Sequence, residues 1–137
     1  MAKTVIVKAI SLDFSTTIFA VLGASSKKES FSNKAFRALR TKSKAVIPIH
    51  PKNNFIEGCQ SYPDIVSIPL RPDVLTVYLS EDNFLPLLDD VEQRGAGEIW
   101  LNPGADSQKV IRELMKRNLP FKKTCTIVEA GFQPFEL

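Results

Sequence analysis

Glycine, serine and lysine gather in one short stretch directly after an apolar run, and these residue types suit anion binding. The run at 17–22 ends at Gly23, and four serines and two lysines lie between positions 25 and 32. Glycine lets the backbone approach a ligand closely, and a following helix offers free N–H groups and a partial positive charge. The pattern favours a diphosphate site over a merely solvated loop.

The candidate anion site extends from the loop to the predicted start of the next helix, with Asn33 as its expected N-cap residue. Its members are Gly23, Ala24, Ser25, Ser26, Lys28 and Asn33. The dinucleotide fingerprint G-x-G-x-x-G would need glycine at positions 25 and 28, where serine and lysine stand. The loop therefore predicts phosphate binding without naming the nucleotide.

A second candidate loop begins with His50, Pro51 and Lys52 after another apolar run. Enzymes that use NAD usually carry Asp or Glu at this point, but the first carboxylate here is Glu57. The cationic Lys52, with a protonated His50, favours a ligand with an extra ribose phosphate, such as NADP or coenzyme A. Alternatively, His50 is a strand-end residue that hydrogen-bonds to the backbone. No carboxylate is placed to orient it as a base, so we predict no catalytic residue.

The composition excludes several other chemistries. One histidine and two cysteines among 137 residues cannot build a multi-histidine metal site or an iron–sulfur cluster within one chain. The net charge of +3 is too small to indicate nucleic-acid binding. No apolar run approaches the roughly 18 residues that span a bilayer. We expect a cytoplasmic protein that binds neither nucleic acid nor membrane and holds no metal.

Short apolar runs alternate with segments of helical periodicity along the chain. This pattern predicts an α/β fold: a three-layer, doubly wound, Rossmann-like parallel sheet of about five strands in the order 3-2-1-4-5. We expect one domain over 1–137, with an N-terminal extension at 1–16 and a tail at 131–137. The expected strands are 17–22, 45–49, 74–79, 98–101 and 120–124, and the expected helices are about ten residues from Asn33, then 83–94 and 107–117.

In such a sheet, ligands bind outside the carboxyl ends of the strands, where the strand order reverses. The predicted order places that point between the first and fourth strands. The loops at 23–33, 50–55, 79–84 and 102–106 would then meet at one edge, which adds Ser80, Asn102 and Gly104 as candidate ligand contacts. The acidic residues after Ser80 are expected to cap a helix rather than to catalyse a reaction.

An ordered set of short motifs covers about residues 17–130. The set resembles the stand-alone CoA-binding domain family, which is similar to the N-terminal CoA-binding domain of the succinyl-CoA synthetase alpha subunit. The motifs are Gly23-Ala24-Ser25, Ile47-Pro48-Ile49-His50-Pro51, Ile56-Glu57-Gly58, Tyr62-Pro63, Ile99-Trp100-Leu101 and Cys125.

The resemblance implies coenzyme A binding through backbone amides of the 23–26 loop. It places Pro51 and Lys52 near the adenosine, and the loops after the third and fourth strands near the pantetheine arm. His50 departs from the family pattern, which has asparagine before the proline. The chain lacks the phosphohistidine domain of the synthetase, so the ligase reaction is not implied.

These observations lead us to expect a protein that binds coenzyme A or an acyl-CoA without catalysis of its own. One alternative is an NADP-binding redox sensor or oxidoreductase fragment. Another is a ligand-free Rossmann scaffold that acts through protein contacts. The sequence leaves open the acyl group, a homo-oligomer and an unidentified protein partner.

Overall fold

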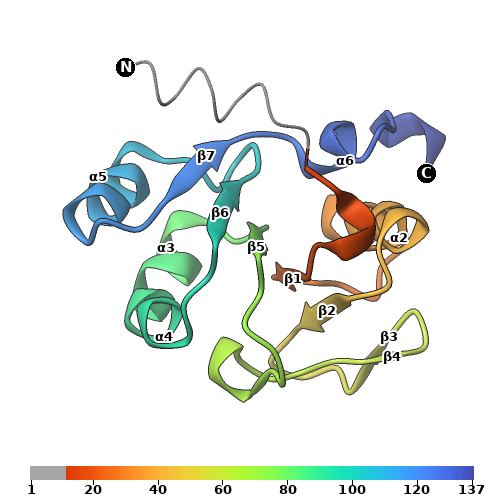
Figure 1. Ribbon diagram of the computed structural model, residues 1–137, viewed down its shortest axis with the longest axis horizontal. Helices are drawn as coiled ribbons and strands as arrows, with labels where there is room; N and C mark the ends of the chain where they lie inside the picture. The colour runs from red at the N-terminus through yellow and green to blue at the C-terminus, as the bar shows by residue number, and fades with distance from the viewer. Residues whose placement is uncertain (1–11) are drawn as a thin grey trace.

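The computed structural model describes residues 12–137. Its centre is a parallel sheet whose strands lie in the order β2-β1-β5-β6-β7 (Figure 1). The strands are short because each is a single apolar run bounded by loops. Their bounds are β1 (Phe19–Leu22), β2 (Val46–Ile49), β5 (Val74–Val77), β6 (Glu98–Leu101) and β7 (Phe121–Lys123). The predicted α/β class and five-stranded parallel sheet are therefore confirmed.

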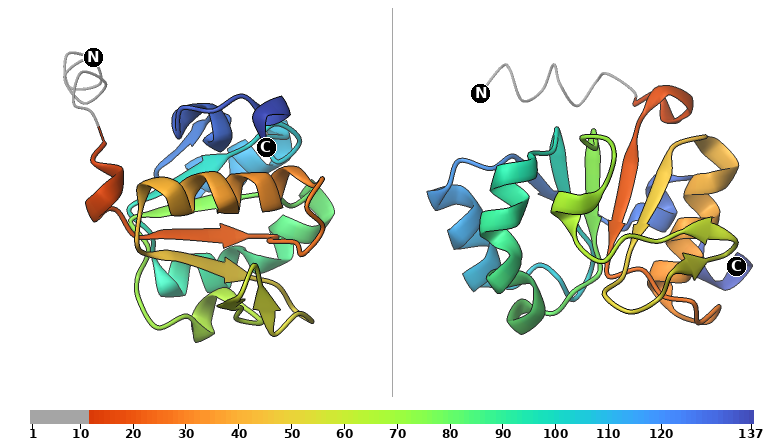
Figure 2. Two further views of the ribbon diagram at one scale, coloured as in Figure 1. Left: turned by 90° about the vertical axis from the view of Figure 1, so that its right-hand side faces the viewer. Right: turned by 90° about the horizontal axis from the view of Figure 1, so that it is seen from below.

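Helices cover both faces of the sheet and make three layers (Figure 2). One face carries α2 (Phe31–Lys42) and α6 (Thr126–Glu129). The other carries a helical segment after β5 and a helix after β6, namely α3 (Glu81–Phe84), η3 (Leu85–Leu87), α4 (Leu88–Arg94) and α5 (Gln108–Lys116). A 3-10 turn, η3, joins α3 to α4 because Pro86 cannot donate a helical hydrogen bond.

Two apolar clusters fill the spaces between the layers. Every residue of β1 and β5 is buried, as expected for strands covered on both faces. The cluster under α2 contains Phe19, Phe36 and Trp100, and the ring centroids of Phe19 and Trp100 lie 5.9 Å apart. This packing holds α2 against the sheet, and the first candidate loop joins β1 to α2.

The predicted strand order 3-2-1-4-5 is wrong. The third strand of the chain, β5, pairs with β1 and does not lie outside β2. On the outer side of β2, Tyr62 forms an isolated bridge: its N–H donates to Pro48 O at 3.0 Å and its carbonyl accepts from His50 N at 2.9 Å. Pro48 lacks an N–H and suits this edge position. The order therefore reverses between β1 and β5, not between the first and fourth strands.

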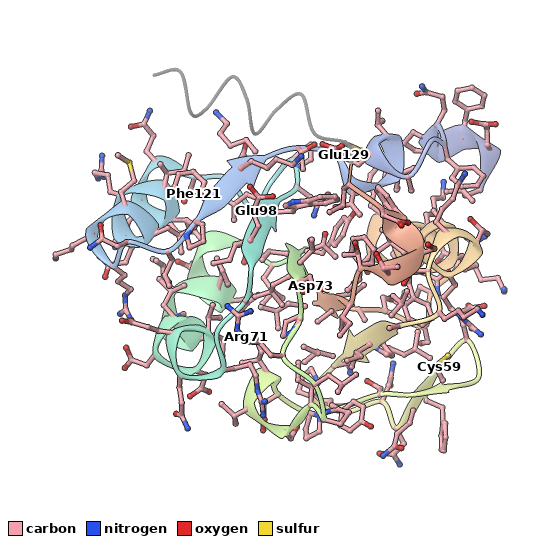
Figure 3. All side chains as sticks on the ribbon, in the orientation of Figure 1. Cys59, Arg71, Asp73, Glu98, Phe121 and Glu129 are labelled. Carbon is pink, nitrogen blue, oxygen red and sulfur yellow. The ribbon has the colours of Figure 1, made fainter. Side chains whose placement is uncertain are left out.

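A small hairpin replaces the irregular segment expected after His50. It consists of β3 (Phe55–Ile56) and β4 (Cys59–Gln60), joined by a tight turn in which Glu57 has φ +50° and Gly58 has φ +77°. Farther along, the chain forms the 3-10 helix η2 (Ile65–Ser67). Figure 3 labels Cys59 on this hairpin, and Asp73 and Glu98 at the amino ends of β5 and β6.

Short 3-10 helices lie near both ends of the described chain. A 3-10 helix, η1 (Phe14–Thr16), precedes β1, and the edge strand or helix start considered for residues 4–10 lies outside the described residues. The tail forms η4 (Pro134–Glu136) and docks on α2, where Lys34 Nζ donates to Pro134 O at 3.1 Å and Arg37 Nη1 donates to Leu137 O at 3.1 Å.

Candidate functional site

Two cavities lie at the carboxyl edge of the sheet, and Leu79 lines both of them. The first cavity has a volume of about 540 Å³, and its lining includes Gly23, Ala24, Ser25, His50, Pro51 and Asn83. The second has a volume of about 400 Å³, and its lining includes Phe31, Tyr78, Ser80, Asn102, Gly104 and Cys125. Eight of the twelve predicted site residues thus line one of two neighbouring cavities at the switch point.

Gly23 is fixed by its neighbour across the sheet. Its φ is +89°, and a Cβ atom at this position would lie 2.8 Å from Tyr78 O. No side chain fits that gap without displacing backbone. The sequence predicts a close approach of the backbone at Gly23. In the structure, the backbone that Gly23 approaches is that of Tyr78, directly after β5.

The loop between β1 and α2 presents unpaired backbone donors. Ala24 N donates to Ile49 O at 3.1 Å, and Lys27 N donates to the Ser25 hydroxyl at 3.0 Å. Within residues 12–137, the N–H groups of Ser25 and Ser26 have no hydrogen-bond acceptor. Two adjacent amides of this kind, close to a helix N-terminus, can bind the oxygens of an anion.

The predicted cap of α2 is wrong. Ser30 is the N-cap, and its hydroxyl accepts from Asn33 N at 3.2 Å. Asn33 is instead fully buried inside the first turn of the helix. Its Nδ2 donates to Ser25 O at 2.9 Å and to Glu57 Oε2 at 3.0 Å, while its Oδ1 accepts from Arg37 Nε at 2.7 Å. Asn33 therefore holds the loop in position through hydrogen bonds, and its side chain has no exposed surface for a ligand.

Lys28 is part of the same hydrogen-bonded group. Its Nζ lies 3.2 Å from Glu57 Oε1, and its backbone carbonyl accepts from Arg37 Nη2 at 2.9 Å. The hairpin thus carries Glu57 onto the first loop, which sequence spacing did not reveal. The hydrogen bond from Asn33, and next in size the one from Lys28, lower the pKa of the Glu57 carboxyl below its usual value, because both stabilise the charged form.

His50 ends β2 and organises the second loop. Its Nδ1 accepts the backbone N–H of Lys52 at 3.0 Å and of Asn53 at 2.9 Å. These two hydrogen bonds agree with the interpretation of His50 as a strand-end residue that bonds to the backbone. Pro51 and Lys52 are exposed beside it.

The floor of the second cavity is a buried polar network. Asn102 Nδ2 donates to Thr76 Oγ1 at 2.7 Å and to Val77 O at 3.0 Å, and its Oδ1 accepts from Thr126 N at 2.9 Å. Both amide protons of Asn102 are used by the protein. Its side chain joins β5, β6 and α6, and this role differs from the ligand contact predicted for it.

Tyr78 and Cys125 also line the second cavity. The Tyr78 hydroxyl is buried and has no hydrogen-bond partner within residues 12–137. Burial raises the pKa of Tyr78 well above its usual value, so the hydroxyl is a neutral donor. The sequence analysis did not select Tyr78. The only available signal was its position directly after β5.

No group of three or more His, Cys, Asp or Glu side chains among residues 12–137 could hold a metal ion. In the same part of the chain, no helix is long and apolar enough to cross a membrane.

Solved structures share this fold over most of the chain. A conserved hypothetical protein from Pyrococcus furiosus is 25% identical, with a TM-score of 0.76 over 82% of this chain and 98% of its own. A Thermus thermophilus protein is 22% identical, with a TM-score of 0.78 over 90% of this chain and 92% of its own. The latter likeness shows the fold alone.

Part of a larger enzyme has the same fold. The dinucleotide-forming acetyl-coenzyme A synthetase 1 of Candidatus Korarchaeum cryptofilum, in complex with phosphate and ADP, is 22% identical. Its TM-score is 0.66, and the match covers 79% of this chain and 25% of that enzyme. No curated protein matches the sequence. The family model described as "CoA binding domain" matches residues 17–131, and the chain therefore belongs to the CoA binding domain family.

Proposed function

We propose that this protein binds coenzyme A, or an acyl-CoA, at the carboxyl edge of β1 and β5. One observation carries the proposal: the adjacent N–H groups of Ser25 and Ser26 find no acceptor in the described part of the chain, 12–137, and lie beside Gly23 at the switch point. Membership of the CoA binding domain family supplies the identity of the anion. The diphosphate of coenzyme A would accept from these two amides.

The two cavities give the remaining parts of the ligand a place. In this proposal the adenosine lies toward the first cavity, against Pro51, with the ribose phosphate near Lys52. The pantetheine arm passes Leu79 and Ser80 into the second cavity, whose lining includes Tyr78 and Cys125. Gly104 has open space over its Cα and permits a close approach of the arm.

The proposal is a binding function and includes no reaction. His50 Nδ1 already accepts two backbone N–H groups, so it is not free to remove a proton. The only neighbouring carboxylates in the first cavity are Asp64 and Asp90. Asp64 Oδ1 accepts from Ser67 N at 2.9 Å and thereby caps η2.

Calorimetry with coenzyme A, dephospho-CoA, NADP and NAD tests the proposal. Coenzyme A should bind most tightly. Dephospho-CoA should bind about three- to tenfold more weakly, because one lysine–phosphate contact of this size is lost. Lys52→Ala should remove the difference between the two ligands. Tighter binding of NADP or NAD, or no binding of coenzyme A at low salt, would refute the assignment.

Lys44→Ala is the matched control for Lys52. Lys44 is also exposed, but it precedes β2 and therefore lies at the opposite edge of the sheet from the cavities. The two variants change the net charge equally. Lys44→Ala should leave the preference for coenzyme A over dephospho-CoA unchanged.

A further inference from the structure

We infer that Glu57 is a built-in competitor of the ligand diphosphate, which holds Lys28 in the free protein and releases it when the ligand binds. The inference rests on the proposed function and adds a residue that sets the affinity of the site for anions. The hairpin brings the Glu57 carboxylate to the loop that is expected to bind the diphosphate.

The position of Glu57 follows from three contacts. Its two carboxylate oxygens accept separately, Oε1 from Lys28 Nζ at 3.2 Å and Oε2 from Asn33 Nδ2 at 3.0 Å. Its backbone carbonyl accepts from Arg40 Nη1 at 3.0 Å. Hydrogen bonds from Asn33 and Arg40 of α2 thus hold Glu57 in place, and the Glu57 side chain is only 18% exposed.

The same asparagine atom links Glu57 to the anion loop. Asn33 Nδ2 donates both to Glu57 and to Ser25 O, at 3.0 Å and 2.9 Å. The carboxylate therefore lies next to the peptide units whose N–H groups would bind the diphosphate. A fixed negative charge beside this loop opposes an incoming anion, and salt weakens the repulsion because the pair lies near the surface.

Lys28 is the partner of Glu57 that can move to the phosphate of the ligand. Its side chain is 71% exposed, whereas the asparagine at the other end of the carboxylate is fully buried. An exposed ion pair of this kind is weak, so an anion with other contacts can displace the carboxylate. Asn33 and Arg40 then keep Glu57 in place while Lys28 turns to the phosphate.

The arrangement favours large ligands over small anions. Inorganic phosphate offers only charge, and its charge must compete with Glu57 for Lys28. Coenzyme A has the contacts of both cavities in addition, which offset the cost of breaking the ion pair. Glu57 thereby raises the selectivity of the loop at the expense of its affinity.

Glu57→Gln tests the inference, because glutamine can still accept from Asn33 through its amide oxygen but cannot hold Lys28. Coenzyme A should bind this variant about three- to tenfold more tightly than wild type. The gain should shrink at about 0.5 M salt, since salt screens exposed charges. Adding Lys28→Ala should remove most of it. A merely structural role for Glu57 would produce none of these changes.

Glu29→Gln is the control. Glu29 lies in the same loop, is exposed and makes no ion pair within residues 12–137. Its substitution removes the same formal charge and should change the affinity less than about twofold. An equal gain in both variants would reduce the effect to net charge and overturn the inference.

The remaining outcomes separate this inference from the proposed function. If wild type binds coenzyme A and Glu57→Gln binds it equally or more weakly, the competitor role is refuted and the binding function stands. If neither protein binds coenzyme A, the proposed function fails and the inference fails with it.

Discussion

Tyr78 O lies 2.8 Å from the point that a Cβ atom of residue 23 would occupy. The carboxyl ends of β1 and β5 therefore lie closer together at Gly23 than any residue with a side chain would allow. This contact brings the loop after β1 beside the residues after β5. Both cavities open from this place, so the shape of the candidate site depends on one missing side chain.

Replacing Gly23 with alanine should destabilise the fold strongly. The substitution combines a strained positive φ with a clash against backbone, and we expect a loss of about 2–4 kcal/mol in the free energy of unfolding. Gly58→Ala is the control, because Gly58 has φ +77° with nothing within 4 Å of a Cβ atom. It should cost only about 1 kcal/mol. Chemical denaturation measures both, and equal losses would contradict the argument.

Asn102 should matter for stability more than for ligand contact. Asn102→Ala removes the acceptor of the buried Thr126 N–H and the two donors to Thr76 Oγ1 and Val77 O, which should cost about 2–4 kcal/mol. Ser80 lines the same cavity but is exposed, and its side chain makes no cap hydrogen bond. Ser80→Ala should therefore cost less than about 0.5 kcal/mol. Denaturation midpoints that shift equally would contradict the assigned role of Asn102.

The sequence predicts the elements of the fold better than their order. The strand β6 (98–101) and the helix α5 agree with prediction to within a residue or two, because each is an apolar pattern with clear end signals. Strand order depends on which edge each strand meets, and local periodicity carries no such information. A proline inside a strand suits an edge position or a strand end, so Pro48 was a signal at odds with the predicted order 3-2-1-4-5, which placed another strand beside β2.

The two cysteines offer a direct test of where the ligand lies. Both are partly buried free thiols, but Cys125 lines the second cavity whereas Cys59 lies on the hairpin (Figure 3). A coenzyme A analogue without its thiol should slow alkylation of Cys125 by iodoacetamide and leave Cys59 unaffected. Mass spectrometry of the labelled peptides reads both sites in one sample. Protection of neither cysteine, or of both equally, would argue against the pantetheine arm in the second cavity.

The stability contributed by Glu57 should depend on pH. Asn33 and Lys28 lower the pKa of its carboxyl in the folded chain, so the unfolded chain binds more protons and stability rises with pH. Wild type should exceed Glu57→Gln by at most about 1 kcal/mol at neutral pH. The gap between their melting temperatures should close as the pH falls below the ordinary value of 4.5. A gap that stays constant down to low pH would contradict the ion pair.

The candidate site was predictable in its location and less so in the roles of its residues. Loops after parallel strands meet at one edge, so the positions of Ser25, His50 and Ser80 follow from the element pattern. Asn33 and Asn102 belong to buried hydrogen-bond networks that the sequence did not indicate, because amide side chains suit a ligand contact and a buried network equally well. Glu57 was missed as a member of the loop because a two-residue turn, Glu57-Gly58, reverses the chain there.

The pairing of β1 also sets an order in time. Its first neighbour in the chain, β2, pairs Val46 with Phe19, but its second, β5, begins at Val74. Ile18 and Asp73, whose side chain accepts the Ile18 N–H at 2.8 Å, are 55 residues apart. During synthesis the loop after β1 is therefore complete long before the strand that faces it exists. Such a long-range contact forms late and slowly, so the candidate site must be among the last parts of a newly made chain to take shape.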